Sequence, residues 1–177
     1  MKCVAPQAGA DHTAPVKISS VATERLVLYP MSVGAAERVV AQEPGDGDLW
    51  AEGYPRDGDV RALTGFLRGV AERGDPGVFR HYEIRLDGVV VGGIGFHGPP
   101  DEVGFATVGY GLVPGVRGKG YASEALRALI EVARQGGASG VKGDADISNP
   151  DSHRVMEAAG MPCVAEDDTL RHFSLGF

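Results

Sequence analysis

The turn at residues 113–122 (VPGVRGKGYA) carries the clearest chemical signal in the chain. Its three glycines surround two cations, Arg117 and Lys119. Glycine lets a backbone turn its N–H groups inward, and the start of the following helix adds partial positive charge. These properties suit a phosphate or a diphosphate. The residues alone leave phosphate binding and a plain strand-to-helix connection equally open.

Two common phosphate-binding motifs do not fit this turn. A Walker A loop would need glycine at 113 and serine or threonine at 120, where the chain has Val113 and Gly120. A dinucleotide-binding GxGxxG motif starting at Gly118 would need glycine in place of Ser123. The turn therefore belongs to neither class.

Sequence patterns around the turn predict the elements that position it. Alternating hydrophobic residues predict three strands, at 79–86, 88–96 and 103–114. An Asp-Gly hairpin signal joins the first two, so the three strands should form an antiparallel meander. Residues 121–137 place apolar side chains on one face of a helix that ends at a glycine.

The remaining segments complete a regular order of elements. A strand is predicted at 23–30, helices at 33–42 and 60–71, a strand at 140–148, a helix capped by Asn149, and two short strands within 162–177. This order indicates an α+β fold with one mixed, mostly antiparallel sheet of about seven strands and helices on both faces. The strand–helix–strand unit at 103–148 favours a right-handed parallel crossover.

The same patterns predict the domain organisation and the ligand crevice. Residues 1–20 lack periodicity and are expected to form a flexible leader, and residues 21–177 a single domain. A ligand crevice is expected where the chain leaves the strand at 107–113 and enters the helix at Gly120.

Composition excludes several classes of protein. The 177 residues carry 17 Lys and Arg against 24 Asp and Glu, a formal net charge of −7, which argues against non-specific nucleic-acid binding. Cys3 and Cys163 are too few for a disulfide framework or a four-cysteine zinc site, so no metal is expected. Apolar runs are too short for a membrane span or a signal peptide, which predicts a cytoplasmic protein without a membrane partner.

The glycine-rich turn and a second segment together resemble a known family. VGYGLVPGVRGKGYASEAL is similar to motif A of the GNAT superfamily of N-acetyltransferases, Gln/Arg-x-x-Gly-x-Gly/Ala, which Arg117, Gly120 and Ala122 match. Residues 147–161 resemble the family's next motif, Asn-x-x-Ser/Ala followed by a helix ending in Gly-Phe/Met. The opening TERLVLYPMS resembles the branch of ribosomal-protein N-terminal acetyltransferases. The resemblance covers residues 23–177.

This resemblance implies a reaction and a set of cofactor contacts. The chain is expected to bind acetyl-CoA and to transfer its acetyl group directly to a primary amine. The turn would hold the diphosphate. Pantetheine would occupy the gap where the strand before the turn diverges from the strand at 140–148. The implied cofactor-binding residues are Gly111, Leu112, Val113, Arg117, Gly118, Lys119, Gly120, Tyr121, Ala122, Asn149 and Ser152. Helix capping explains Asn149 equally well.

The catalytic residues usual in this branch are missing. Relatives often place a glutamate base where Thr107 stands and a tyrosine acid where Met156 stands. His97 and Glu102 are the candidate bases, Glu83 is a weaker one, and a solvated side chain is the alternative for each. Ser152 is the candidate proton donor to the thiolate, with an ordinary first-turn serine as the alternative.

The missing base affects which kind of acceptor amine the protein can use. Deprotonating a lysine at pH 7.4 costs about 4 kcal/mol, whereas an α-amine costs less than about 1 kcal/mol. A weak base therefore favours an α-amine or an aminosugar. Residues 43–59 hold six acidic residues beside aromatic ones, and can bind a cationic amine or form a solvated loop. The predicted substrate-binding residues are Trp50, Glu52, Tyr54 and Thr107.

Three functions follow. The first is acetyl-CoA-dependent N-acetylation of a small-molecule amine or a peptide or protein N-terminus. The second is modification of an antibiotic or aminosugar by the same chemistry. The third is a non-catalytic acyl-CoA-binding regulator that kept the fold and lost its base. Homodimers are common among similar proteins, so a homodimer is one expected assembly.

Overall fold

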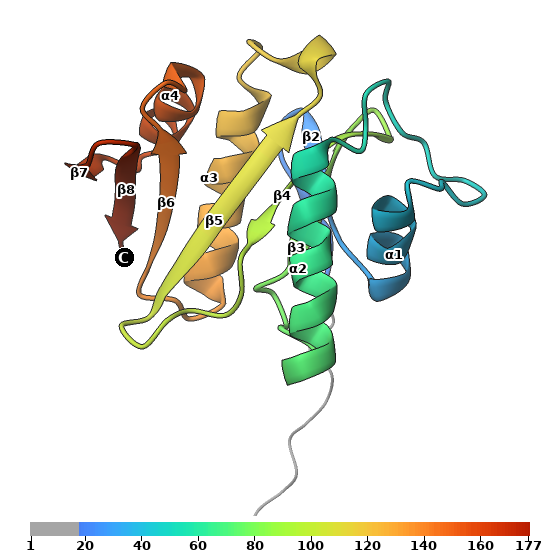
Figure 1. Ribbon diagram of the computed structural model, residues 1–177, viewed down its shortest axis with the longest axis horizontal. Helices are drawn as coiled ribbons and strands as arrows, with labels where there is room; N and C mark the ends of the chain where they lie inside the picture. The colour runs from blue at the N-terminus through green and yellow to red at the C-terminus, as the bar shows by residue number, and fades with distance from the viewer. Residues whose placement is uncertain (1–17) are drawn as a thin grey trace, which may run out of the picture.

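One sheet of eight strands organises residues 18–177, which the computed structural model describes (Figure 1). The strands are β1 (Val21–Ala22), β2 (Leu26–Pro30), β3 (His81–Leu86), β4 (Val89–Phe96), β5 (Phe105–Leu112), β6 (Gly140–Asp146), β7 (Cys163–Glu166) and β8 (Leu170–Gly176). Their order across the sheet is β1-β2-β3-β4-β5-β6-β8-β7, and every neighbouring pair except β5 and β6 is antiparallel. The predicted mixed, mostly antiparallel sheet is confirmed, and the two-residue β1 raises the strand number above the predicted seven.

Helices cover both faces of this sheet, as predicted. They are α1 (Val33–Ala41), α2 (Asp57–Arg73), α3 (Tyr121–Gln135) and α4 (Pro150–Ala158), with a 3-10 turn η1 (Pro114–Val116) after β5. In Figure 1, α2 lies in front of the sheet and α3 behind it. Most of the predicted leader, and Cys3 with it, lies outside the described residues.

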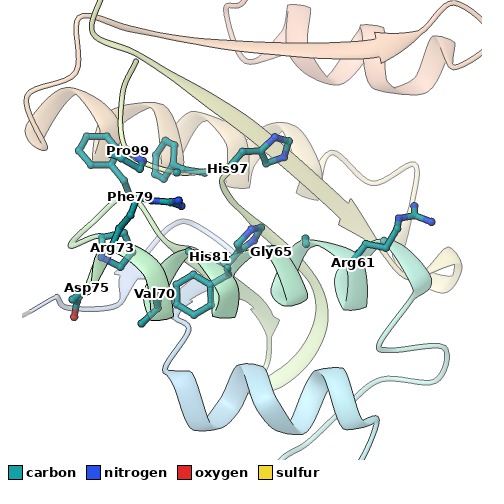
Figure 2. Close-up of a pocket in the computed structure, with 17 residues that line it drawn as sticks. Arg61, Gly65, Val70, Arg73, Asp75, Phe79, His81, His97 and Pro99 are labelled. Atoms are coloured by element: carbon teal, nitrogen blue, oxygen red, sulfur yellow. The ribbon is translucent and has the colours of Figure 1, made fainter. Parts of the chain in front are cut away.

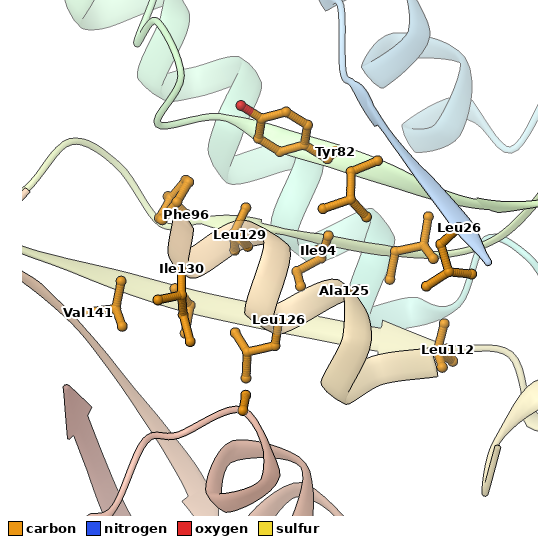
Figure 3. Packing of buried hydrophobic residues seen from close by; sticks show 14 of the residues in the cluster. Leu26, Tyr82, Ile94, Phe96, Leu112, Ala125, Leu126, Leu129, Ile130 and Val141 are labelled. Carbon is orange, nitrogen blue, oxygen red and sulfur yellow. The ribbon is translucent and has the colours of Figure 1, made fainter. Parts of the chain in front are cut away.

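The face under α3 is a closed hydrophobic layer. Ala125, Leu126 and Leu129 of α3 are fully buried, and Figure 3 shows them beside Ile94 of β4. Burying a leucine of this kind stabilises the fold by roughly 1.5–3 kcal/mol. This layer fixes α3, and therefore the glycine-rich turn at its start, against the sheet.

The β5–β6 pair opens along its length. The two strands pair in parallel over Phe105–Thr107 and Gly140–Lys142, and then β5 continues beside β4 while β6 continues beside β8. The parallel pairing confirms the predicted parallel direction of these two strands. Beyond Thr107 the edge of β5 that faces β6 has no ladder partner within the described sheet, so a gap opens toward the glycine-rich turn.

Candidate functional site

A cavity of about 550 Å³ lies at the glycine-rich turn, between the end of β5 and the first turns of α3 and α4, and we call it the turn cavity. Nine of the eleven predicted cofactor-binding residues line it: Gly111, Leu112, Arg117, Gly118, Gly120, Tyr121, Ala122, Asn149 and Ser152. The other two differ. Val113 is buried, and the exposed Lys119 contributes its carbonyl oxygen to a bond from Arg25.

The backbone of the turn suits an anion. Gly118 and Gly120 have φ values of 74° and 81°, a left-handed conformation that glycine adopts without strain. Gly120 is the N-cap residue of α3, and no side chain within residues 18–177 caps this helix start. The first N–H groups of a helix have no intrahelical partner, and here their residues, Tyr121, Ala122 and Ser123, line the cavity. This arrangement fits a diphosphate.

A buried carboxylate braces the turn from behind. Glu124, in the first turn of α3, accepts hydrogen bonds from the Thr23 hydroxyl (2.6 Å) and from the Arg25 backbone N–H (2.8 Å) and Nε (2.7 Å). Burial alone would raise the pKa of Glu124, but these bonds hold that pKa below its ordinary value. The Arg25 guanidinium also donates to the Lys119 carbonyl (3.0 Å) and stacks on Tyr121. The negative charge of Glu124 is thereby neutralised away from the cavity.

The start of α4 forms the opposite wall. Asn149 accepts a hydrogen bond from the Ser152 backbone N–H (3.2 Å), so its capping role is observed. The Tyr110 hydroxyl of β5 donates to the Ser152 carbonyl (3.1 Å) and ties β5 to α4 across the gap. Burial raises the pKa of Tyr110 to about 12.

A second, smaller cavity of about 230 Å³ adjoins the turn cavity on the α2 face of the sheet, and we call it the central cavity. The two share Arg56 and Tyr110 as lining residues. Arg56 donates to both carboxylate oxygens of Asp59 (2.8 and 2.9 Å). A Cβ at Gly111 would lie only 2.0 Å from the Arg56 guanidinium, so this close approach requires glycine. Arg56 therefore separates the two cavities.

Two buried polar side chains face the central cavity without a partner. His81 is 7% exposed, and its ring has no hydrogen bond within residues 18–177; burial lowers its pKa to about 4. The Tyr54 hydroxyl is buried without a partner among the same residues, and burial raises its pKa. The Tyr54 hydroxyl is the fully buried, unsatisfied atom of the two, and such groups are rare in folded proteins, which marks this cavity as a place for a ligand.

The candidate bases lie in different places. His97, at the end of β4, puts its Nε2 2.6 Å from where a Cβ of Gly109 would be, over the central cavity. Glu102 is exposed in the turn before β5, at the opposite end of that strand from the glycine-rich turn. Glu83 is buried and bound to Arg85 (2.6 Å). Of the three, the structure brings His97 to the cavities.

The residues predicted to bind the acceptor also lie in different places. Tyr54 lines the central cavity. The Trp50 ring packs edge-on against the Tyr54 ring, with 5.4 Å between the ring centroids. Thr107 accepts a hydrogen bond from the His97 backbone N–H (2.9 Å). Glu52 is exposed outside the lining residues, and Asp48 is bound to Arg38 (2.6 Å). Asp48 of the acidic loop therefore forms an internal ion pair and is not available to bind an amine.

A third cavity of about 710 Å³ continues from the central cavity along one side of α2 (Figure 2), and we call it the α2 groove. It shares Gly58, Ala62, His81 and His97 with the central cavity. The three cavities therefore lie in a row from the glycine-rich turn to the far end of α2, and each shares lining residues with the next.

Sequence reasoning missed Arg56, His81 and Tyr110. A usable signal was present for this surface: glycines recur at every second position in β4 (93 and 95) and in β5 (109 and 111). Because alternate residues of a strand share a face, this pattern leaves one face of two neighbouring strands without side chains. His81 lies directly across from Gly95, in the same row.

Two other types of site are not found among the described residues. No helix there has the length and apolar character to cross a membrane. No cluster of three or more His, Cys, Asp or Glu there is arranged to hold a metal ion.

The family of this chain is shown by a comparison with protein-family profiles. Residues 25–162 match the family profile described as an acetyltransferase (GNAT) domain. A search of curated proteins finds no match.

Three solved structures, all below 25% identity, show the same fold. A GNAT-family acetyltransferase from Bacillus anthracis has a TM-score of 0.64 at 19% identity, covering 89% of this chain and 98% of its own. RimL, a ribosomal L7/L12 alpha-N-protein acetyltransferase, has a TM-score of 0.65 at 15% identity, covering 96% and 100%. RimJ from Mycobacterium smegmatis, in complex with CoA-disulfide, has a TM-score of 0.61 at 19% identity, covering 85% and 81%.

Proposed function

The chain belongs to the acetyltransferase (GNAT) family, and we propose that the amine it acetylates is the α-amine of a peptide or protein N-terminus. The acetyl donor of the family is acetyl-CoA. One observation carries the choice of amine: Asp59, the carboxylate that lines the central cavity, is held by Arg56, and the candidate base Glu83 is held by Arg85. Without a free carboxylate base, an amine of low pKa is the acceptor that costs least to deprotonate.

The turn cavity supplies the donor site in this proposal. The first-turn N–H groups of α3 would bind the diphosphate, with Arg117 at the cavity wall adding positive charge; Arg154 in the same wall is paired with Asp151. The unpaired edge of β5 at Tyr110 and Leu112 would hydrogen-bond the pantetheine amides, whereas Gly111 pairs with Gly93 of β4. The activity of RimL, which is a ribosomal L7/L12 alpha-N-protein acetyltransferase, supports the choice of acceptor.

The chemistry needs two proton movements. The amine nitrogen attacks the thioester carbonyl carbon, a C–N bond forms, and the C–S bond breaks. The nitrogen loses a proton, which we assign to His97 because its imidazole overlies Gly109 beside the gap between β5 and β6. The departing sulfur gains a proton, for which the Ser152 hydroxyl at the turn cavity is the proposed donor.

These assignments have direct kinetic tests. His97→Ala should remove one limb of the pH–rate profile and keep affinity for CoA; an unaltered profile would exclude His97. Ser152→Ala should lower kcat more than it lowers CoA affinity, and a wild-type kcat would exclude that role.

The main experiment measures thiol release from acetyl-CoA with the purified chain. The acceptor panel holds a pentapeptide with a free α-amine, the same peptide with its N-terminus blocked and one lysine added, and an aminosugar. We expect turnover with the free α-amine above both others. Preference for the aminosugar would support an antibiotic- or aminosugar-modifying enzyme. Tight CoA binding without turnover on any amine would support a regulator.

A matched pair of variants tests the donor site. Gly120→Asp places a carboxylate where the diphosphate is expected, and Gly120→Asn has the same shape and the same backbone strain without the charge. We expect the aspartate variant to bind CoA at least about tenfold more weakly than the asparagine variant in calorimetry, because two negative charges would meet. Equal affinities would overturn the assignment of the turn.

The acceptor class also implies a location. Polypeptide N-termini are presented together with acetyl-CoA in the cytoplasm, so we infer a cytoplasmic protein. Cell fractionation tests this, and recovery of the chain outside the cytoplasmic fraction would contradict it.

A further inference from the structure

We propose that the α2 groove binds the first residues of the acceptor as an extended segment, and that it selects segments with an apolar side chain flanked by acidic groups. This inference rests on the proposed function, because it assumes an α-amine at the central cavity. It adds the sequence preference, which neither the family nor the fold specifies.

The groove exists because one face of α2 lacks side chains. Gly58, Ala62, Gly65 and Gly69 recur at intervals of four, three and four residues, which places them on one face of the helix. A Cβ added at Gly65 would meet nothing within 4 Å, so packing does not require glycine there. Glycine in a helix costs about 1 kcal/mol relative to alanine. The open space is therefore maintained at a cost in stability.

The buried imidazole of His81 independently indicates that the groove holds a ligand. His81 lines both the groove and the central cavity, is 93% buried, and has no hydrogen bond to its ring within residues 18–177. Figure 2 shows the ring between the helix and His97. An extended segment whose first nitrogen lies in the central cavity would bring a peptide N–H or C=O to this imidazole.

The middle of the groove is apolar. Phe66 and Val70 line it from α2, and Phe79 and Phe96 line it from the sheet side. Phe79 and Phe96 pack edge-to-face at 5.3 Å, and Phe66 packs edge-on against His81 at 6.2 Å. This fixed aromatic wall favours an apolar side chain at the middle of the segment.

The two ends of the groove are positively charged. Arg61 lies at one end and Arg73 at the other (Figure 2). Arg61 has no ion pair within the described residues, and Arg73 contacts Glu72 through an exposed pair that contributes little. Asp75, the acidic residue in the lining, is bound by Arg80. Positive charge at both ends, unpaired at Arg61 and weakly paired at Arg73, favours acidic groups in the occupant.

The size of the groove favours a peptide over a small amine. The backbones of Arg61 and Arg73 are twelve positions apart, about 18 Å along the helix axis, and the Arg73 guanidinium folds back over Gly69 within this length. An extended chain advances about 3.3 Å per residue, so about five residues span this length. A free amino acid or an aminosugar would fill only a small part of the 710 Å³.

The charge preference is tested with two synthetic pentapeptides, Ala-Asp-Phe-Ala-Glu and Ala-Lys-Phe-Ala-Lys. We expect kcat/KM at least about tenfold higher for the acidic peptide. The double variant Arg61→Glu with Arg73→Glu should reverse this order. The control is Arg134→Glu, an exposed position on α3 at the other face of the sheet, which should leave the order unchanged. Equal rates for both peptides, or no response to the double variant, would overturn the charge preference.

The groove itself is tested by filling it. Gly65→Leu should lower kcat/KM for the acidic pentapeptide at least tenfold, leave kcat/KM for alanine amide unchanged, and raise the melting temperature because leucine favours a helix. The control Ala71→Leu adds the same side chain on the exposed opposite side of α2. Unchanged peptide kinetics in Gly65→Leu would overturn the groove. Absence of acetylation of any α-amine by the unmodified protein would instead overturn the proposed function.

Discussion

The helices α2 and α3 cover opposite faces of one sheet and pack in opposite ways. In α3, of 15 residues, the apolar side chains Ala125, Leu126, Leu129, Ile130 and Ala133 are all buried. In α2, of 17 residues, the buried side chains are Asp59 and Leu63. The first helix is fixed by a continuous apolar contact, and the second stands off the sheet and leaves two cavities beneath it.

The sheet itself causes this difference. Its α3 face presents Ile94 of β4 and Val108 of β5, both buried. Its α2 face has glycine at the neighbouring positions 93, 95, 109 and 111, where Arg56, Asp59, His81 and His97 occupy the space that side chains would fill. The same two strands therefore provide a stabilising surface on one side and a polar cavity floor on the other. Stability and binding are thus assigned to different faces.

The largest expected effect is on stability, from truncating one leucine in each helix. Leu126→Ala removes a fully buried side chain and should lower the free energy of unfolding by about 3–4 kcal/mol. Leu67→Ala on α2 removes a half-buried one and should cost less than about 1.5 kcal/mol. Urea unfolding of both variants measures the difference. Equal losses would mean that α2 packs as tightly as α3.

The second-largest effect is a loss of folding stability at acid pH, caused by His81 on the α2 face. The pKa of His81 is about 4, because burial disfavours the imidazolium and His97 adds repulsion, while Asp59 opposes both. An unfolded histidine titrates near 6.5, so between about pH 6.5 and 4 the unfolded state binds a proton that the folded state does not. Stability should therefore fall by about 3 kcal/mol as pH drops through this window.

His81→Gln isolates this contribution from the carboxylates that also titrate in acid. The variant should show a flatter dependence of unfolding free energy on pH between 6.5 and 4 than the unmodified protein. Parallel curves for the two proteins would mean that His81 is hydrated in the folded state and carries no buried-imidazole penalty.

Most elements were predictable because their signals are local. The helix of Tyr121–Gln135 follows from apolar spacing, and the cap at Asn149 from the Asn-Pro pair that starts α4. The glycines at 118 and 120 marked the turn because left-handed backbone favours that residue. Each of these inferences needs only neighbours in the chain.

The α2 face was harder because its chemistry depends on partners far apart in sequence. The sequence left the acidic loop at 43–59 open between an amine-binding site and a solvated loop, and in the structure its Asp48 is bound to Arg38. The groove beside it is instead lined by Arg61 and Arg73. Ion pairing between separate segments decides which charges remain free, and periodicity in one segment carries no information on that. His81 was missed for the same reason, since its burial depends on α2.

The smallest effect compares two tyrosines on the two faces. The Tyr82 hydroxyl donates to the Val78 carbonyl (2.8 Å), whereas the Tyr54 hydroxyl is buried without a partner in the described residues. Tyr82→Phe should therefore lower the free energy of unfolding by about 1 kcal/mol and leave acetylation unchanged. Tyr54→Phe should leave stability unchanged or raise it by about 1 kcal/mol, because an unsatisfied buried group is removed.

Acetylation separates the two variants further. If the Tyr54 hydroxyl is kept unsatisfied in order to bond the acceptor, Tyr54→Phe should lower kcat/KM for the acidic pentapeptide about tenfold, a loss of about 1.4 kcal/mol in transition-state binding. Steady-state kinetics and thermal unfolding on the same preparations give both readouts. Loss of stability with full activity would assign the Tyr54 hydroxyl to packing. The α2 face would then differ from the α3 face only in tightness, because its buried polar groups would not be held for a ligand.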